Sequence, residues 1–263
     1  MKIIHLSDLH VGKEDKGVIF QSIVNKINEL TPASDYIIVI TGDLIQSAIK
    51  DEKSNSIHLN EVITQITKLE SSGFKVLVVP GNHDYGNAKK INSKLMTLFK
   101  TKLYGNANES FPRIYPTNDI VFIGLDSIEG EFDAKINSAE PEPEKVIILG
   151  TIGQIGKDQR DRLIGKLKDY ESQKDIKFVV YLHNDPFTNR FAFYLKDRDE
   201  LKTIFENKIS LLLCGHTHEN RTWDNWGFQT FNAGSSTNKK EYHDKIRCID
   251  TSTVPFEVSF LTI

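Results

Sequence analysis

Short apolar segments rich in Val and Ile, each bounded by polar or glycine residues, restrict most strongly how this chain can fold. They lie at Lys2–Leu6, Tyr36–Ile40, Lys75–Val79, Ile120–Leu125, Lys177–Leu182 and Ser210–Leu213. Their length and composition predict buried strands. The early ones alternate with segments of helical period, Val18–Leu30 and Leu59–Leu69. Strands that alternate with helices predict an α/β fold.

The second half of the chain predicts two further helices, Lys157–Tyr170 and Asp197–Phe205, before the pattern changes. After residue 225 only strand-like runs remain, and we expect them to form an antiparallel meander: Gly227–Phe231, Lys245–Asp250 and Phe256–Thr262. The acidic, proline-containing stretch 129–144 is typical of a surface excursion rather than a linker. With no internal repeat, residues 1–263 are predicted to form a single domain.

Potential metal ligands and acid–base residues directly follow five of the predicted strands. In chain order they are Asp8 and His10; Asp43; Asn82, His83 and Asp84; His183; and His216 and His218. Loops at the carboxyl ends of strands in an α/β sheet converge on one place. Residues two apart in extended backbone point the same way, so each Asp-x-His or His-x-His pair is expected to present two ligands to one centre.

Each motif alone has an ordinary structural explanation. Asp8 and Asp43 could be helix caps or turn residues, and His183 could be a satisfied core histidine. The five motifs together favour a metal site, because independent turns would have to place Asp, Asn and His after strands in this order by accident. The remaining histidines, His5, His58 and His243, lie outside the pattern and are expected to be structural or exposed.

The type and number of ligands indicate which ions could bind. Imidazole, carboxylate and amide oxygen without thiolate suit Mn, Fe or Zn, alone or as a mixed pair. Seven ligands are too many for one ion, but they fit two divalent cations about 3.5–4 Å apart that share a carboxylate. Such a pair generates a nucleophilic hydroxide at neutral pH and holds the oxygens of a phosphoryl group.

Composition restricts the partners. The formal net charge is −3, so the surface as a whole does not attract a polyanion, and nucleic acid is disfavoured. No apolar run approaches the roughly 20 residues of a membrane span. The N-terminus lacks a secretory pattern, and Cys214 and Cys248 are expected to be reduced, so a cytoplasmic location is predicted. A homodimer is left open.

The ordered blocks Asp8-Leu9-His10, Gly42-Asp43, Gly81-Asn82-His83-Asp84, His183 and Gly215-His216-Thr217-His218 resemble the calcineurin-like metallophosphoesterase family. The resemblance implies a four-layered αββα sandwich with two mixed β-sheets. One metal would take Asp8, His10, Asp43 and His218, and the other Asn82, His183, His216 and the shared Asp43. His83 would contact the phosphate and protonate or stabilise the leaving oxygen, with Asp84 orienting it.

Finer features look like the bacterial cyclic-nucleotide phosphodiesterase branch: Leu125-Asp126-Ser127, and Gly153-Gln154-Ile155-Gly156 with Gln159 and Leu163 opening a helix. That branch commonly has His-His-Pro-Pro where this chain has His183-Asn184-Asp185-Pro186. The substrate expected is therefore a small phosphodiester, a cyclic nucleotide or similar, hydrolysed by attack of a metal-bridging hydroxide. The alternatives are a metal-dependent nuclease and a non-catalytic scaffold that keeps the fold.

Overall fold

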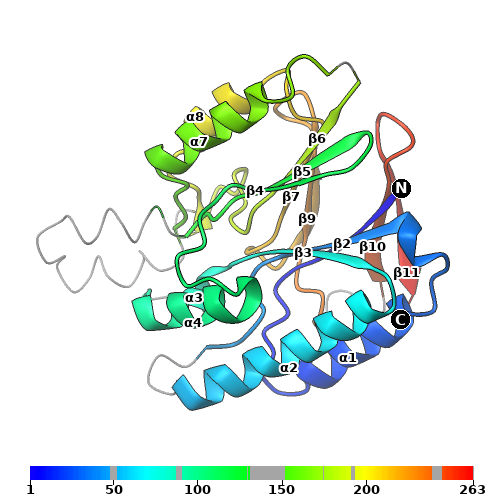
Figure 1. Ribbon diagram of the computed structural model, residues 1–263, viewed down its shortest axis with the longest axis vertical. Helices are drawn as coiled ribbons and strands as arrows, with labels where there is room; N and C mark the ends of the chain where they lie inside the picture. Colours follow the sequence, from blue (N-terminus) through cyan, green and yellow to red (C-terminus); the bar gives the residue numbers. More distant parts are fainter. Residues whose placement is uncertain are drawn as a thin grey trace, which may run out of the picture.

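Two β-sheets packed face to face form the centre of the molecule, as the computed structural model shows (Figure 1). The structure describes residues 1–47, 52–86, 91–128, 130, 152–173, 175–190, 193–238 and 245–262. Helices cover the outer face of each sheet, α1 and α2 on one side and α7 and α8 on the other (Figure 1). This is the predicted four-layered αββα sandwich.

The first sheet has the strand order β11-β10-β1-β2-β3. Its strands are β1 (Lys2–Leu6), β2 (Tyr36–Thr41), β3 (Lys75–Val79), β10 (Lys245–Asp250) and β11 (Glu257–Thr262). The first three run parallel, whereas β10 pairs antiparallel with both β1 and β11. Its covering helices are α1 (Lys16–Ile27) and α2 (Glu52–Ser71), and the short helices α3 (Asn82–Tyr85) and α4 (Ser93–Tyr104) follow β3.

The second sheet has the order β4-β5-β6-β7-β9-β8. Its strands are β4 (Arg113–Pro116), β5 (Ile120–Gly124), β6 (Lys177–Tyr181), β7 (Leu211–Cys214), β8 (Asn220–Trp223) and β9 (Gln229–Ala233). The four central strands are parallel, and β4 and β8 are antiparallel edges. The covering helices are α7 (Lys157–Lys168) and α8 (Arg198–Phe205). Both sheets are therefore mixed, as expected.

Alternation along each strand builds the layers. On β1, Ile3 packs between the sheets while Ile4 faces α1 and α2, and both side chains are completely buried. The cluster between the sheets contains side chains from both, including Val39 of β2 and Phe122 of β5. Burial of such apolar surface is the main stabilising contribution to folding. This shared core leads us to expect one cooperative unfolding transition.

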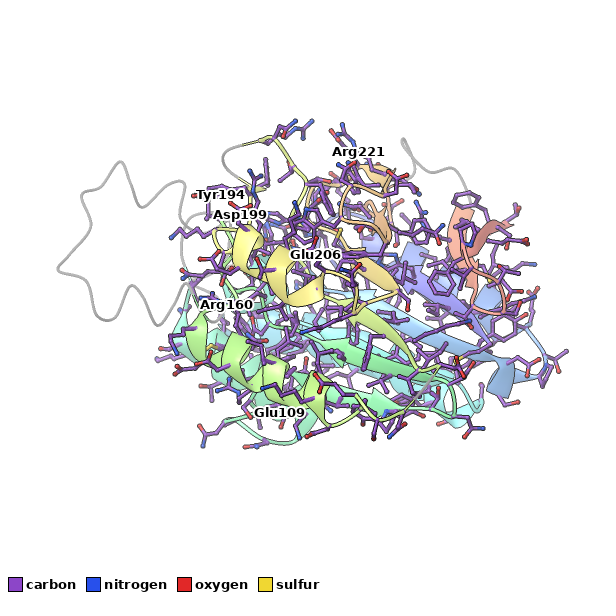
Figure 2. All side chains as sticks on the ribbon, turned by 90° about the horizontal axis from the view of Figure 1, so that it is seen from above. Glu109, Arg160, Tyr194, Asp199, Glu206 and Arg221 are labelled. Carbon is purple, nitrogen blue, oxygen red and sulfur yellow. The ribbon has the colours of Figure 1, made fainter. Side chains whose placement is uncertain are left out.

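An ion pair joins the two helices on the outer face of the second sheet. Arg160 of α7 contacts Asp197, the residue before α8, and the Asp197 carboxylate also accepts hydrogen bonds from the backbone N–H groups of Ile155 (3.0 Å) and Gly156 (2.9 Å). Seen from above, α7 with Arg160 and α8 with Asp199 lie side by side, and Glu206 directly follows α8 (Figure 2). Asp197 thus connects the loop before α7 to the start of α8.

The C-terminal prediction was wrong in one respect. The run around Gly227–Phe231 becomes β9, which pairs in parallel with β7 in the second sheet, so it does not form a meander with β10 and β11. Only β10 and β11 form the expected antiparallel pair, and they extend the first sheet. The acidic stretch 129–144 lies, apart from Gly130, outside the described residues. In the part of the chain that the structure describes, no helix is both long and apolar enough to span a membrane.

Candidate metal centre

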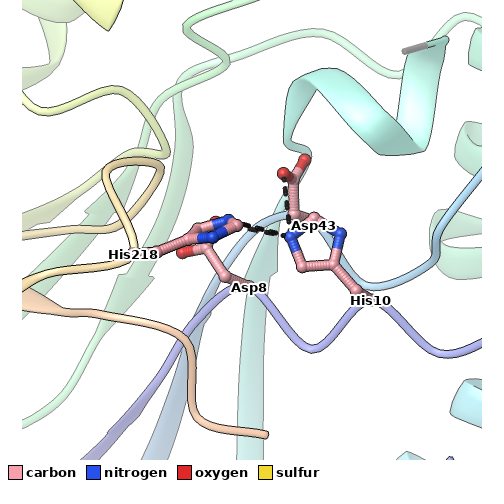
Figure 3. Close-up of side chains that lie close together, drawn as sticks. All are labelled: Asp8, His10, Asp43 and His218. Carbon is pink, nitrogen blue, oxygen red and sulfur yellow. Dashed lines mark hydrogen bonds and ion pairs between the residues drawn. The ribbon is translucent and has the colours of Figure 1, made fainter. Parts of the chain in front are cut away.

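One group of ligands gathers where β1, β2 and β7 end. Asp8, His10, Asp43 and His218 each place a ligand atom within 4.8 Å of the others (Figure 3). Nε2 of His218 lies 3.2 Å from Oδ1 of Asp8 and 3.0 Å from Nε2 of His10. The first three side chains are buried and His218 is partly exposed. The structure thus brings together the four residues that the resemblance assigned to one metal.

A second group lies beside the first. Asp43, His183 and His216 also place ligand atoms within 4.8 Å of one another, and all three are buried. Nε2 of His183 is 3.0 Å from Nδ1 of His216 and 3.2 Å from Oδ1 of Asn82. Asn82 therefore joins this group through an amide oxygen. The seven predicted ligands form two adjoining sets.

Asp43 connects the two groups, one oxygen to each. Its Oδ2 lies 3.7 Å from Nε2 of His10, and its Oδ1 lies 3.5 Å from Nε2 of His183. A carboxylate whose two oxygens face separate ligand sets has the geometry needed to bridge a pair of cations. The structure thus places Asp43 between the two groups, and its sharing by two ions stays a prediction.

The residues also fit cations in their chemistry. The convergence places imidazole nitrogens opposite one another, and Oδ1 of Asp8 is buried with Nε2 of His218 3.2 Å away. Buried polar atoms of this kind are costly unless something pairs with them. Nitrogen and oxygen ligands without thiolate suit divalent ions of the first transition row. Divalent cations are therefore the ligands that this site fits.

The backbone of the ligand residues is in the left-handed region rather than extended. We had expected the paired ligands to point the same way because of extended backbone, and that reason was wrong. Positive φ angles occur at Asp8 (52°), His10 (47°), Asp43 (52°), His216 (71°) and His218 (58°). Asp and His enter this region more readily than most residues, and such conformations cluster at functional sites. Hydrogen bonds between the loops hold them there; for example, the N–H of Asp8 donates to O of Gly42 (3.0 Å).

Glycine at positions 42 and 81 allows the loops to approach one another. Gly42 has φ of 85°, and a Cβ there would lie 2.7 Å from the backbone nitrogen of Gly81. A Cβ on Gly81 would lie 2.2 Å from Oδ1 of Asp43. No larger residue fits either position without moving the Asp43 carboxylate or its neighbours.

Neighbouring groups orient the ligands. Ser7 donates to Oδ2 of Asp8 (2.6 Å), as does the backbone N–H of His216 (2.9 Å), which leaves Oδ1 directed at the ligand set. Nδ1 of His183 lies 2.7 Å from the carbonyl oxygen of Thr41, so a proton on Nδ1 leaves Nε2 as the ligand atom. The partners that fix ligand orientation in metal sites are thus present.

Ser7→Ala is expected to weaken metal binding by about 10- to 100-fold, because Asp8 loses its hydroxyl donor. Competition with a fluorescent chelator measures this change. Ser22→Ala on the exposed surface of α1 is the matched control, since its hydroxyl bonds only to the carbonyl of Val18. Equal affinities of Ser7→Ala and wild type would contradict the role of this hydroxyl.

Asn232 of β9 is a supporting residue that the sequence did not reveal. Its Nδ2 is within hydrogen-bond distance of O of Gly215 (2.7 Å), Oδ2 of Asp185 (2.9 Å) and Oγ1 of Thr217 (3.0 Å). This buried amide connects the loop that carries His183 to the loop that carries His216 and His218. The available signal was weak: a polar amide beside apolar residues in the segment Thr230-Phe231-Asn232-Ala233.

The titration of the ligands depends on burial and on neighbouring carboxylates. Burial lowers the pKa of His10 to about 3, although Asp43 and Asp8 oppose the shift. The pKa of His218 is raised, because the hydrogen bond and charge of Asp8 outweigh its burial. Burial alone would raise the pKa of Asp8, but His218, His183 and His10 hold it well below its usual range. His10 is thus neutral and ready to bind an ion throughout the neutral range.

The metal-free protein is expected to lose stability as the pH falls from 6.5 toward 3, and His10 contributes to this loss. In that window the unfolded chain binds a proton at His10 and the folded protein does not, so protonation favours unfolding. His10→Asn should reduce the slope of unfolding free energy against pH by about 1.4 kcal/mol per pH unit near pH 5. Urea unfolding in EDTA at several pH values measures this slope. An unchanged slope in His10→Asn would contradict the lowered pKa of His10 in the folded protein.

His83 and Asp84 lie beside the ligands with different contacts. The backbone N–H of His83 donates to Oδ1 of Asp43 (2.8 Å), and its ring lies 4.9 Å from the ring of His10. Asp84 accepts from the backbone N–H groups of Leu44 (2.9 Å) and Gly81 (2.8 Å). Asp84 thus holds the backbone of the loops, and its orientation of the His83 ring stays a prediction.

A cavity of about 520 Å³ opens next to the first ligand group. His10, His83 and His218 border it, together with residues of the β1–α1 loop, the start of α1 and the segment after β9. A small molecule can therefore reach the ligand set and the His83 ring from one space.

Comparisons with known proteins show which family and which solved structures this chain is similar to. The family model described as calcineurin-like phosphoesterase matches residues 1–220. No curated protein sequence is significantly similar to the chain. The fold is similar to a dimetal phosphatase from Danio rerio, with a TM-score of 0.68 and 12% identity over 100% of this chain and 98% of the other.

Two further structures share the fold. GAP50, described as the anchor in the inner membrane complex of Plasmodium, has a TM-score of 0.60 and 12% identity, covering 100% of this chain and 84% of its own. The phosphopantetheinyl hydrolase PptH from Mycobacterium tuberculosis has a TM-score of 0.51 and 16% identity, with 91% of each chain covered. At such identities the likeness concerns the fold alone. The family model, however, spans most of the chain and both ligand groups, so the protein belongs to the calcineurin-like phosphoesterase family.

Proposed function

We propose that the protein hydrolyses a small phosphodiester with the help of two divalent cations. The observation that carries this proposal is the position of Asp43, whose two carboxylate oxygens face the two ligand groups. Asp8, His10, Asp43 and His218 would hold one ion. Asn82, His183, His216 and Asp43 would hold the other. Mn, Fe and Zn, alone or as a mixed pair, suit this donor set.

When bound, such a pair polarises phosphoryl oxygens and makes water nucleophilic at neutral pH. The remaining steps fall to the protein. His83 borders the same cavity as His10 and His218, and we assign it the delivery of a proton to the leaving oxygen. Its backbone N–H holds Asp43, so the acid and the bridging carboxylate keep a fixed relation.

Substrate size and charge support a small ester rather than a polymer. The cavity of about 520 Å³ accommodates a nucleotide-sized molecule, and the net charge of −3 gives no general attraction for nucleic acid. Free, buried Cys214 and Cys248 support a cytoplasmic location.

Cyclic nucleotides are one member of this substrate class. Asn184, which stands where the cyclic-nucleotide branch commonly has its second His, is completely buried and hydrogen-bonded to Ser127 (2.8 Å between Oγ and Oδ1). It therefore supports the loop after β6 rather than lining the cleft. Because Asn184 supplies no contact that is specific for cyclic nucleotides, cyclic and acyclic diesters are both candidate substrates.

The test uses purified protein with Mn²⁺ and bis(p-nitrophenyl) phosphate, cyclic AMP and glycerophosphocholine as separate substrates. We expect metal-dependent release of p-nitrophenol that stops on chelation and returns when Mn²⁺ is restored. The other two substrates then distinguish cyclic from acyclic esters. Absence of turnover with all three, in protein shown to contain metal, would overturn the proposal.

A further inference from the structure

A lysine ammonium group stands at the rim of the cleft, held by neutral partners. Lys16, the first residue of α1, is half-buried, and its Nζ donates to Oγ1 of Thr237 (3.2 Å) and Oγ of Ser235 (3.4 Å). No carboxylate of the described residues lies within 4 Å of this nitrogen. The ammonium is therefore positioned by hydroxyl groups rather than neutralised by an ion pair.

Both hydroxyls are themselves fixed to the ligand loop. Ser235 donates its proton to the carbonyl oxygen of Asp8 (2.8 Å), and Thr237 donates to that of Leu9 (2.8 Å). Each hydroxyl has one proton to donate, so its lone pairs are what it offers to Lys16. An ammonium has three donors, and the two hydroxyls occupy two of them. Lys16 is thus held in place relative to Asp8 with donor capacity to spare.

The charges around this position leave the ammonium without a close counterion. Lys16 borders the cavity that also contacts His10, His83 and His218, and the neighbouring Lys13, Glu14 and Asp15 border it too. Burial and the charge of Lys13 lower the pKa of Lys16, and the carboxylates of Asp8, Glu14 and Asp15 oppose this shift. An anionic group bound in the cavity beside Lys16 would stabilise the charged form of its side chain.

We propose that Lys16 is a specificity-determining residue that binds a second anionic group of the substrate, beyond the phosphoryl group that is cleaved. The substrate class is then a phosphoester that carries a further phosphate or carboxylate on its leaving or retained part. This inference rests on the proposed function, because it takes the cavity as the substrate cleft.

Charge balance at the ligand sets favours a second anion over the cleaved group as the partner of Lys16. A pair of divalent cations, less the charges of Asp8, Asp43 and the attacking hydroxide, already balances the single negative charge of a phosphodiester. The Lys16 ammonium lies to one side of those ligands, against Ser235 and Thr237. A charge placed there acts on a group next to the reacting phosphorus.

The test compares two non-hydrolysable probes, methylphosphonate and methylenediphosphonate, by calorimetric titration of the Mn²⁺-loaded protein. Wild type should bind the diphosphonate more tightly. Lys16→Gln should reduce that preference roughly tenfold, the loss expected for one charge-assisted hydrogen bond, while methylphosphonate binding changes little. Lys16→Arg should restore most of the preference. Metal content measured after each titration excludes chelation as the cause.

Lys26→Gln is the matched control, because Lys26 lies on the same helix, pairs with Glu29 and is remote from the cavity lining. It should leave both affinities unchanged. An unchanged preference in Lys16→Gln, or an equal loss for both probes, would overturn the inference, provided that thermal unfolding shows a folded variant. Binding is read without turnover, so failure to hydrolyse diesters would reject the proposed function and leave this result standing.

Discussion

Asp43→Asn is expected to abolish diesterase activity, with a loss of at least about 10³-fold, and to leave one metal ion or fewer per chain. The carboxylate places one oxygen toward His10 and the other toward His183, so an amide at this position deprives one of the two ligand groups of its anionic oxygen. Metal analysis after dialysis and the rate with bis(p-nitrophenyl) phosphate measure the two effects.

Asp35→Asn provides the control for this change, because Asp35 is an exposed carboxylate in the short turn of helix just before the same strand, β2. It should keep full metal content and rate. Circular dichroism establishes that both variants fold. If Asp43→Asn retained two ions and wild-type turnover, the bridging role would be wrong.

His83→Ala is expected to lower kcat by about 10²- to 10⁴-fold while both ions remain bound. The ring borders the cavity and is not needed to complete either ligand group. Because the proposed task is protonation of the leaving oxygen, the loss should be smaller for a p-nitrophenyl ester, whose leaving group is stable as an anion, than for a methyl ester.

The dependence on the leaving group separates acid catalysis from a structural effect. His83→Gln keeps a polar side chain of similar length and should show the same dependence. A loss that is equal for both esters, or that accompanies loss of metal, would instead indicate a structural role of the His83 ring, because the backbone N–H that donates to Asp43 is kept in both variants.

The strands that carry the ligands could be predicted because their information is local. Residues 2–6, 36–40 and 75–79 are continuous apolar runs, and runs of that length in an α/β chain become buried parallel strands. The general rule that strand ends converge then placed Asp8, Asp43 and His183 together without any knowledge of the loops.

Other elements depend on contacts that the sequence does not display. Arg113–Pro116 and Asn220–Trp223 are only four residues long, and they become strands because they pair with β5 and β9. The wrong prediction for β9 has the same cause, because the residues Gln229–Ala233 do not indicate which of the two sheets the strand joins. Left-handed backbone at His216 and His218 is likewise set by the surrounding hydrogen bonds.

Helix α4 was missed although its signals are local. Asn92 caps it by accepting hydrogen bonds from the backbone N–H groups of Lys94 (2.9 Å) and Leu95 (3.4 Å), and Gly105 ends it in the left-handed conformation with φ of 71°. An Asn cap and a terminal glycine around a stretch with buried Leu95 and Phe99 are sufficient to predict this helix.

Each ligand group draws on both sheets. Asp8, His10 and Asp43 follow strands of the first sheet, whereas His218 follows β7 of the second; likewise Asn82 follows β3, and His183 and His216 follow β6 and β7. A cation at either position therefore ties the two layers of the sandwich together, and its binding energy adds to their cohesion. Loss of metal would therefore weaken the packing between the two sheets as well as abolish the proposed hydrolysis.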